Sequence, residues 1–479
     1  MYRGFADSNG NSVFLGIPFA ATTGGKNRWR EAQDVPKLLP GTIVNATSFG
    51  PTCPQAITSQ YYSRQDEDCL NLNVWAPRGG KNLPVFVYMY GGAMVTGSSS
   101  NPLYQGNNFA RKGVVFVSFN TRESIWGAPN SAELKAAHPD ASQNFEISDV
   151  DKAMEWIHDN IHAFGGNPDH IVFGGQSSGS VQVDHYLWNH PDTWLKGAFQ
   201  MAANAISGPT YAPLNEGLDV VSAQVGCPTG KGQLDCLRKV SIFDIQTAFF
   251  NSTANVFFTP TIDNITRHSD YVSRFHAGKY ASHVPLLVGI TDDEGALFGS
   301  IVYASENTNF SDWINHFNAD LGHIPDDVLI AAYNPADYAT ESDRSGASYG
   351  DARFYCPTDY FLDLRSAKQD TWAYRYFAPY NLGDLPTHTP THESAQVLAN
   401  HLNDWLIAWI KNPAAGPGWE KASPLSGPLA LVGVPDDELS ISMGVTGDYN
   451  SRCKAVYKPY FPKYPFIRDL RDIVPFEFR

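Results

Sequence analysis

The chain has 479 residues, of which 43% are hydrophobic and 17% charged, and its formal net charge is −15. Such acidity argues against binding to nucleic acid or to an anionic membrane surface. No apolar run approaches the roughly 20 residues that a membrane-spanning helix needs, and the first twenty residues lack the pattern of a signal peptide.

Short apolar runs and two amphipathic segments alternate along the chain. In chain order they are strand-like 84–90 and 113–120, helical 148–164, strand-like 170–175 and 284–290, and helical 394–412. The runs are nearly continuous in Val, Ile and Phe, which is typical of a sheet covered on both faces. A strand, a helix and a strand in this order form a βαβ unit, so we expect one α/β domain over residues 1–479 with a mostly parallel sheet.

The ends of the two helical segments carry recognisable signals. Ser148 is a candidate N-cap for the first helix, and Gly165 and Gly166 are expected to end it before the next strand. Pro413 is expected to stop the second helix.

The cysteines and glycosylation sequons favour an oxidising compartment. Six cysteines are present, and their spacing fits neither a zinc site nor a Cys-x-x-Cys motif. N-x-[ST] sequons stand at Asn45, Asn251, Asn264 and Asn309. We therefore expect a secreted glycoprotein whose signal peptide has been removed. The alternative is a cytosolic protein with six inert thiols.

The pattern G-x-S-x-G occurs twice, and its context separates the two copies. Ser177 follows the strand-like run 170–175 and precedes a segment that can continue as a helix. On such a strand-to-helix turn the flanking glycines let the serine hydroxyl project outward as a nucleophile. Ser348 follows a polar stretch and is expected to lie in a loop. Ser178 is rejected as nucleophile because Gln176 precedes it at the position where the pattern needs glycine.

A serine nucleophile also needs donors for the oxyanion. Tyr90-Gly91-Gly92-Ala93-Met94 directly follows the strand-like residues 84–89, and the small residues let backbone N–H groups approach a tetrahedral oxygen. The segment is a candidate oxyanion loop; the alternative is an ordinary tight turn.

Several blocks of the sequence resemble one known family, the type-B carboxylesterases, which are the cholinesterase-like branch of the α/β-hydrolases. The blocks are "FGGNPDHIVFGGQSSG" (164–179) and "EDCLNLNVWAP" (67–77), which resemble the two family signatures, together with "FLGIPFA" (14–20), "VPLLVGITDDEG" (284–295) and "YGDARFYCP" (349–357), the last being similar to fungal members. The resemblance implies an α/β-hydrolase fold and hydrolysis of small carboxylic esters through an acyl-enzyme, without metal or organic cofactor.

The resemblance also implies roles for particular residues. Ser177 becomes the nucleophile, and Glu294 the triad acid, although Asp292 and Asp293 cannot be excluded by pattern alone. The oxyanion donors become the N–H groups of Gly92, Ala93 and Ser178. Ala93 and Ser178 depart from the glycine and alanine that are usual in the family.

The histidine of the triad is ambiguous. Of the five histidines after Glu294, those at 316, 323 and 401 lie in surface-like or helical sequence. The family expects a small residue at +2 and an acidic residue at +3. His392 has Ser394 at +2 and Glu393 at +1, and it fits better than His388. We therefore expect His392 to be the base, with His388 as the alternate.

The same resemblance pairs the cysteines as Cys53–Cys69, Cys227–Cys236 and Cys356–Cys453. Only 15 residues separate the first pair, and they include Tyr61 and Tyr62 but no tryptophan, which disfavours choline specificity and a lipase lid. Met94 and one of these tyrosines are expected to line the substrate pocket. A long-chain lipase and a non-catalytic, cholinesterase-like binding module remain as alternative functions. The natural ester and the oligomeric state are not indicated.

Overall fold

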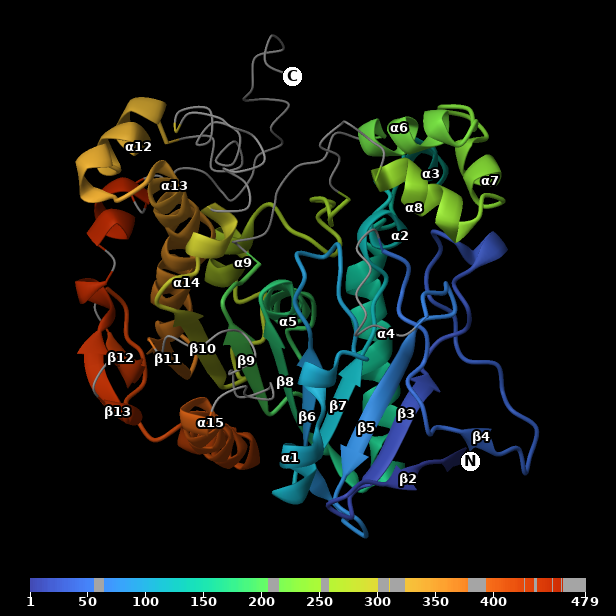
Figure 1. Cartoon of the computed structure of the whole chain (residues 1–479), viewed down its shortest axis with the longest axis horizontal. Coiled ribbons are helices and arrows are strands. Elements are labelled where there is room, and N and C mark those ends of the chain that lie inside the picture. The colour runs from blue at the N-terminus through green and yellow to red at the C-terminus, as the bar shows by residue number, and fades with distance from the viewer. Residues whose placement is uncertain are drawn as a thin grey trace.

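The computed structural model describes residues 1–55, 64–205, 215–250, 258–299, 310, 324–377, 393–425, 427–434, 437–449, 451–457 and 459. Within this part of the chain an eleven-stranded sheet has the order β13-β12-β11-β10-β9-β8-β6-β7-β5-β3-β2. Figure 1 shows the strands as one twisted row across the molecule, with helices lying around it.

The strands of the main sheet are β2 (Phe5–Ala6), β3 (Ser12–Pro18), β5 (Asn71–Ala76), β6 (Leu83–Met89), β7 (Val115–Phe119), β8 (Gly166–Gln176), β9 (Gly197–Met201), β10 (Leu286–Thr291), β11 (Thr371–Tyr376), β12 (Pro428–Val434) and β13 (Asp437–Val445). All neighbours from β7 to β12 are parallel, whereas both ends of the sheet are antiparallel. A separate pair joins β1 (Tyr2–Arg3) to β4 (Val44–Asn45). The prediction of a mostly parallel sheet is confirmed.

The described helices are α1 (Asn107–Arg111), α2 (Ser124–Gly127), α3 (Ala132–Ala137), α4 (Phe145–Asn160), α5 (Ser178–Asn189), α6 (Glu216–Gln224), α7 (Gln233–Leu237), α8 (Ile242–Phe250), α9 (Tyr271–His276), α12 (Asp326–Ala332), α13 (Glu341–Gly350), α14 (Cys356–Ser366) and α15 (Glu393–Lys411). None of them is long and apolar enough to cross a bilayer. Every residue of β5, β7 and β9 is buried, so the centre of the sheet is covered on both faces.

Four strand predictions and one helix prediction are confirmed. The runs 84–90, 113–120, 170–175 and 284–290 overlap β6, β7, the apolar part of β8, and β10, respectively. The second amphipathic segment forms α15, which ends at Lys411, two residues before Pro413.

The first helix begins earlier than expected, and Ser148 is not its cap. Helix α4 starts at Phe145 with Asn144 at the N-cap position, and its last turn continues as a 3₁₀ segment to Phe164. Asn144 exchanges hydrogen bonds with the backbone of Thr261 at 2.8 Å in both directions, which fixes where the helix starts. Gly165 ends it in the left-handed conformation, as expected, with φ at 88°.

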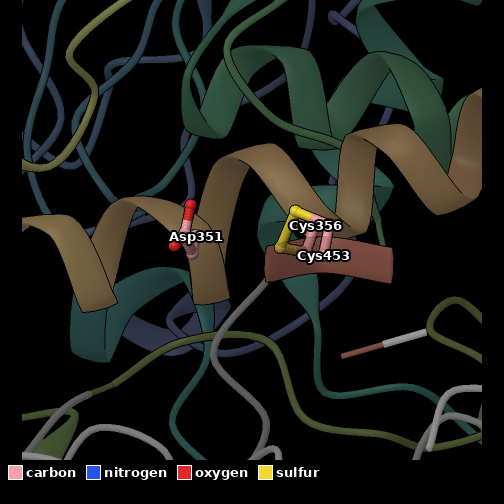
Figure 2. A group of neighbouring side chains, drawn as sticks. All are labelled: Asp351, Cys356 and Cys453. Carbon is pink, nitrogen blue, oxygen red and sulfur yellow. A yellow bond between two sulfur atoms is a disulfide. The ribbon is translucent and has the colours of Figure 1, made fainter. Parts of the chain in front are cut away.

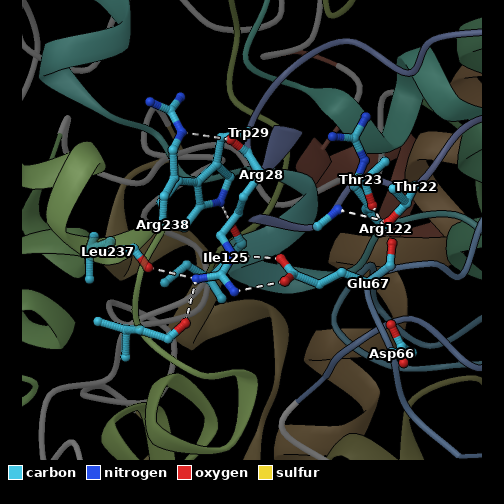
Figure 3. A network of polar contacts seen from close by, with 12 residues as sticks. Thr22, Thr23, Arg28, Trp29, Asp66, Glu67, Arg122, Ile125, Leu237 and Arg238 are labelled. Atoms are coloured by element: carbon cyan, nitrogen blue, oxygen red, sulfur yellow. Dashed lines mark hydrogen bonds and ion pairs between the residues drawn. The ribbon is translucent and has the colours of Figure 1, made fainter. Parts of the chain in front are cut away.

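The block 67–77 anchors the N-terminal part of the chain to α7. Glu67 pairs through both carboxylate oxygens with buried Arg28, at 2.5 and 2.7 Å. Arg28 also donates to the carbonyl oxygens of Leu237, the last residue of α7, and of Val240, just beyond it. Figure 3 shows the guanidinium lying between the Glu67 carboxylate and Leu237. The block therefore has a structural role: Glu67 holds an arginine that links positions more than 200 residues apart in the chain.

A second buried ion pair joins α5 to α14. Arg365 and Asp184 are fully enclosed, with Nη2 and Oδ1 2.8 Å apart. The guanidinium also lies over the rings of Trp188, Tyr280 and Phe361. An unpaired charge would be very unfavourable in such a site, so the pair fixes how the two helices pack.

Three disulfides form with the expected partners: Cys53–Cys69, Cys227–Cys236 and Cys356–Cys453. The third joins the start of α14 to the short helical segment Cys453–Tyr457, across 97 positions of sequence. It therefore ties the C-terminal part of the described chain to the helices beside β10 and β11.

Candidate active site

Ser177 lies in a strained turn between β8 and α5. Its φ and ψ are 55° and −124°, outside the regions that a non-glycine residue ordinarily adopts. The turn is held by hydrogen bonds from Ser177 N–H to the Met201 carbonyl, at 2.8 Å, and from Val181 N–H to the Ser177 carbonyl. A conformation of this kind costs on the order of 1–3 kcal/mol and persists only where the surroundings enforce it.

The glycines around Ser177 are required by close backbone approach. A Cβ atom on Gly175 would lie 2.4 Å from the backbone of Gly179, and one on Gly179 would lie 2.3 Å from the Met89 carbonyl oxygen. Helix α5 therefore touches both its own strand and the end of β6. This contact is the physical reason for the spacing G-x-S-x-G at this turn.

The candidate oxyanion loop, residues 90–94, lies beside Ser177. Strands β6 and β8 are parallel neighbours in which Met89 aligns with Gly175, so the loop and the serine leave the same edge of the sheet. A Cβ atom on Gly91 would lie 2.8 Å from the Ser177 Cβ. The first N–H groups of a helix have no intrahelical acceptor, and Ser178 is the first residue of α5.

Ala93 adopts a backbone conformation that favours glycine. Its φ is 57°, and that of the next residue, Met94, is 63°. Alanine at this position therefore adds roughly 1–2 kcal/mol of strain that glycine would avoid.

Glu294 follows β10 and differs in its contacts from its two acidic neighbours. Asp292 pairs with Arg375 at 2.8 Å, and exposed Asp293 accepts a hydrogen bond from the Ala296 N–H. Glu294 Oε1 accepts from the Thr291 N–H at 2.6 Å. Asp292 and Asp293 are thus engaged elsewhere, which supports the choice of Glu294 as the acid.

Tyr355 fixes the turn that carries Glu294, and sequence reasoning gave it no role. Its hydroxyl accepts from the Glu294 N–H at 2.8 Å and donates to the Asp292 carbonyl at 2.6 Å. Burial raises the pKa of the Glu294 carboxyl to about 7, although the Thr291 hydrogen bond and the charge of Arg375 act in the opposite direction. The only sequence signal for Tyr355 was its position in the block 349–357.

Ser177 and Glu294 lie at the same edge of the sheet, on strands separated by β9. The backbone joins these ends laterally, since Ser177 N–H bonds to Met201 and Ala202 N–H bonds to Gly289. Two strand spacings amount to about 10 Å, which is enough for one imidazole between a hydroxyl and a carboxylate. His392 and His388 lie outside the described residues, as do His316 and His323, and His401 is exposed on α15.

Apolar side chains gather next to the serine. Met94 is buried in a cluster with Val181, Ala202, Ala203 and Phe354, against which Phe298 and Tyr349 pack. Val181 is one helical turn after Ser177, and Ala202 follows the residue that accepts the Ser177 N–H. Met94 therefore lies in an apolar cluster near Ser177, whereas Tyr61 and Tyr62 lie outside the described residues. The three aromatic members were not anticipated from sequence.

The second G-x-S-x-G does not form a loop. Ser348 lies inside α13, where it is buried and donates to the Ser345 carbonyl at 2.9 Å. Thr340 and Asp343 form a reciprocal capping box that starts this helix. The expectation of a loop was therefore wrong, because the polar composition concealed a helix start signal.

One group of side chains has the spacing of a metal site. The ligand atoms of Asp351, Cys356 and Cys453 lie within 4.8 Å of one another. Figure 2 shows the two sulfur atoms joined in a disulfide beside the carboxylate. A disulfide offers no thiolate to a metal, and Asp351 is engaged by Arg452 and Tyr333. The arrangement is therefore a structural cluster.

A mostly parallel sheet that carries a strained serine between strand and helix defines the α/β-hydrolase class. The chain belongs to the carboxylesterase family, whose sequence profile matches residues 2–410.

Similar proteins include esterases, lipases and cholinesterases. The chain is 35% identical over 306 residues to para-nitrobenzyl esterase of Bacillus subtilis (strain 168), a match that spans 60% of either protein. It is 30% identical to lipase 4 of Diutina rugosa over 74% of each, and 30% identical to acetylcholinesterase of Electrophorus electricus over 74% of this chain and 60% of that one. A solved carboxylesterase of Geobacillus stearothermophilus shares the fold, with a TM-score of 0.79 at 22% identity over 95% of this chain and 97% of that one.

Proposed function

We propose that the chain is a serine carboxylesterase, with Ser177 as the nucleophile. The observation that carries the proposal is the strained conformation of Ser177 at the end of β8, beside a glycine-rich loop from the adjacent strand. Glu294 is the proposed acid, and the N–H groups of Gly92, Ala93 and Ser178 are the proposed oxyanion donors. His392 remains the proposed base and His388 its alternate.

The proposed mechanism is acyl transfer to water. The histidine, oriented by Glu294, removes the Ser177 proton as the hydroxyl oxygen attacks the ester carbonyl. The backbone donors stabilise the tetrahedral oxyanion, and collapse expels the alcohol, which takes its proton from the imidazolium. A water molecule, deprotonated by the same histidine, then hydrolyses the acyl-enzyme and releases the acid.

Ser177→Ala tests the nucleophile directly. We expect its rate on p-nitrophenyl butyrate to fall by at least 10³-fold, since the remaining groups supply only binding and oxyanion stabilisation. Ser178→Ala is the matched control: it keeps the backbone N–H, and its rate should stay close to that of the unmodified chain. Retention of most activity by Ser177→Ala would remove Ser177 from this role. A chain that failed to react with an organophosphonate probe would instead be a non-catalytic binding module.

Substitution of each candidate histidine identifies the base. His392→Gln should abolish both turnover and phosphonate labelling, whereas His388→Gln should leave both near the starting level. The reverse result would assign the role to His388.

A lipase is the second candidate, because Diutina rugosa lipases are among the similar proteins. The apolar cluster around Met94 supports acceptance of an apolar acyl group. Rates on p-nitrophenyl esters from butyrate to palmitate separate the two activities: a carboxylesterase loses rate steeply with acyl length, and a lipase does not.

Secretion and glycosylation form a further part of the proposal. The three disulfides support folding in an oxidising compartment, and a secreted lipase of Arthroderma benhamiae is among the similar proteins. Asn45 and Asn264 are exposed, whereas Asn251 and Asn309 lie outside the described residues. A mass shift on treatment with an N-glycosidase tests this part.

A further inference from the structure

Two buried glutamates lie behind the candidate oxyanion loop, and the proposed mechanism uses neither. Glu123 follows β7 and Glu146 lies in the first turn of α4, and each is 1% exposed. Carboxyl groups are rarely enclosed to this degree without a cation. The nearby cation, Arg122, is already engaged by Asp149 through Nε and Nη2, at 2.8 and 2.7 Å.

Glu123 and its neighbours hold both ends of the oxyanion loop. The Tyr90 hydroxyl donates to Glu123 Oε1 at 2.9 Å, and the Thr121 hydroxyl donates to the same oxygen at 3.2 Å. Thr121 N–H donates back to the Tyr90 hydroxyl at 3.3 Å. At the far end of the loop, Ser124 N–H donates to the Met94 carbonyl at 3.0 Å. The segment 121–124 thus bridges the first and last residues of the loop.

Glu146 contacts the helix that begins after the nucleophile. Its Oε1 accepts from Gln182 Nε2 at 2.8 Å, and Gln182 lies on α5, five residues after Ser177. The other carboxyl oxygen, Oε2, has no hydrogen-bond partner in the described part of the chain. One carboxyl group is therefore bound to the oxyanion loop and the other to the nucleophile helix.

The two carboxyl groups affect each other's ionisation. Burial, followed by the charge of Glu123, raises the pKa of Glu146 well above its usual range, and burial raises the pKa of Glu123 likewise. Removal of a carboxyl group from water disfavours its charged form, which is the main cause of both shifts.

We propose that Glu123 and Glu146 are positioning residues that fix the oxyanion loop relative to Ser177, one through the Tyr90 hydroxyl and the other through Gln182. The inference rests on the proposed esterase function, because that function requires the oxyanion loop to lie at a fixed position relative to Ser177. Geometry at this loop has a large effect: a shift of about 1 Å in a reacting group costs on the order of 10²-fold in rate.

Three substitutions test the positioning role. Tyr90→Phe removes only the hydroxyl that reaches Glu123, and Glu123→Leu removes the acceptor. For both we expect kcat for p-nitrophenyl butyrate, counted per site titrated with a phosphonate, to fall by about ten- to a hundredfold while KM changes less than about threefold. Glu123→Gln keeps a side-chain oxygen that can accept from the Tyr90 hydroxyl, so its kcat should stay within about threefold of that of the unmodified chain.

A matched control separates positioning from stability. Glu67→Leu removes another buried carboxylate, whose partner is Arg28, and should lower the melting temperature without changing kcat per titrated site. The inference is overturned if Tyr90→Phe keeps full kcat per site, or if Glu123→Gln loses as much as Glu123→Leu. Failure of phosphonate titration in the unmodified chain, or full activity of Ser177→Ala, would instead overturn the proposed function itself.

Discussion

Replacing Gly179 with alanine would place a methyl group between α5 and the end of β6. The new Cβ would lie 2.3 Å from the Met89 carbonyl oxygen and 2.4 Å from that of Tyr90. Both contacts are with backbone, so no side chain can rotate away. Because real Cβ atoms essentially never come closer than 3.0 Å, the helix and the strand end must separate by at least about 0.7 Å.

This separation displaces the serine from the oxyanion loop. We expect Gly179→Ala to lower the free energy of unfolding by about 1–3 kcal/mol, the usual effect of overpacking. A shift approaching 1 Å should also lower kcat by on the order of 10²-fold. The loss should appear in kcat per titrated site, because the distance that changes is the one between Ser177 and the oxyanion loop.

The assay combines urea unfolding with turnover of p-nitrophenyl butyrate, normalised by phosphonate titration. Gly444→Ala on β13 is the matched control, because its new Cβ would meet only the mobile end of the Leu431 side chain, at 3.1 Å. Its stability should change by less than about 1 kcal/mol and its kcat should not change. Wild-type kcat and stability in Gly179→Ala would refute the reasoning.

Three further predictions concern stability. Arg365→Met leaves Asp184 buried without its partner and should cost about 3–5 kcal/mol in urea unfolding, most of which the double variant with Asp184→Leu should recover. Joint replacement of Cys356 and Cys453 by serine releases a constraint across 97 positions and should lower the unfolding free energy by about 4–5 kcal/mol in the chain-entropy description. The Glu294 carboxyl holds its proton up to about pH 7 in the folded state and only to about 4.3 when unfolded. The stability that Glu294 contributes to the folded state is therefore fully present below the unfolded pKa and is lost as pH rises through about 7, by on the order of 3 kcal/mol. Glu294→Gln should lack this pH dependence.

Each of these predictions has a contradicting outcome. Equal stability of Arg365→Met and its double variant would show that the buried charge is not the source of the loss. A disulfide variant weakened no more than one lacking Cys227–Cys236, which closes only nine positions, would contradict the dependence on loop length. Parallel curves of melting temperature against pH for the unmodified chain and Glu294→Gln would show that this carboxyl does not titrate as described.

Local sequence patterns predicted the strands and the strand-to-helix turn at Ser177 because these depend on short-range features. A run of buried residues followed by Gly-x-Ser-x-Gly places Ser177 without knowledge of the rest of the chain. The start of α4 was misplaced because Asn144 is held by Thr261, which is 117 positions away. Such a bond leaves no trace in the local pattern.

For the candidate site residues, too, contacts that are distant in the sequence could not be predicted. Glu294 was chosen over Asp292 only through family resemblance. In the structure Asp292 is bound by Arg375, 83 positions later, a contact that the local pattern does not indicate. The hydrogen bond between Glu123 and Tyr90 could not be predicted either, because a glutamate that follows a strand in the sequence is expected to be exposed to solvent. Tertiary contacts of polar side chains are what the sequence did not reveal.

The disulfide between Cys356 and Cys453 also determines what a protease can detach. A cut at any single position between these residues would leave both fragments joined through their sulfur atoms. Such a nicked molecule would migrate as one species on a denaturing gel without reductant and would separate into two once a thiol was added. Except for cuts inside the short loops closed by Cys53–Cys69 and Cys227–Cys236, comparing the two gels therefore shows whether cleavage lies inside or outside the segment enclosed by this bond.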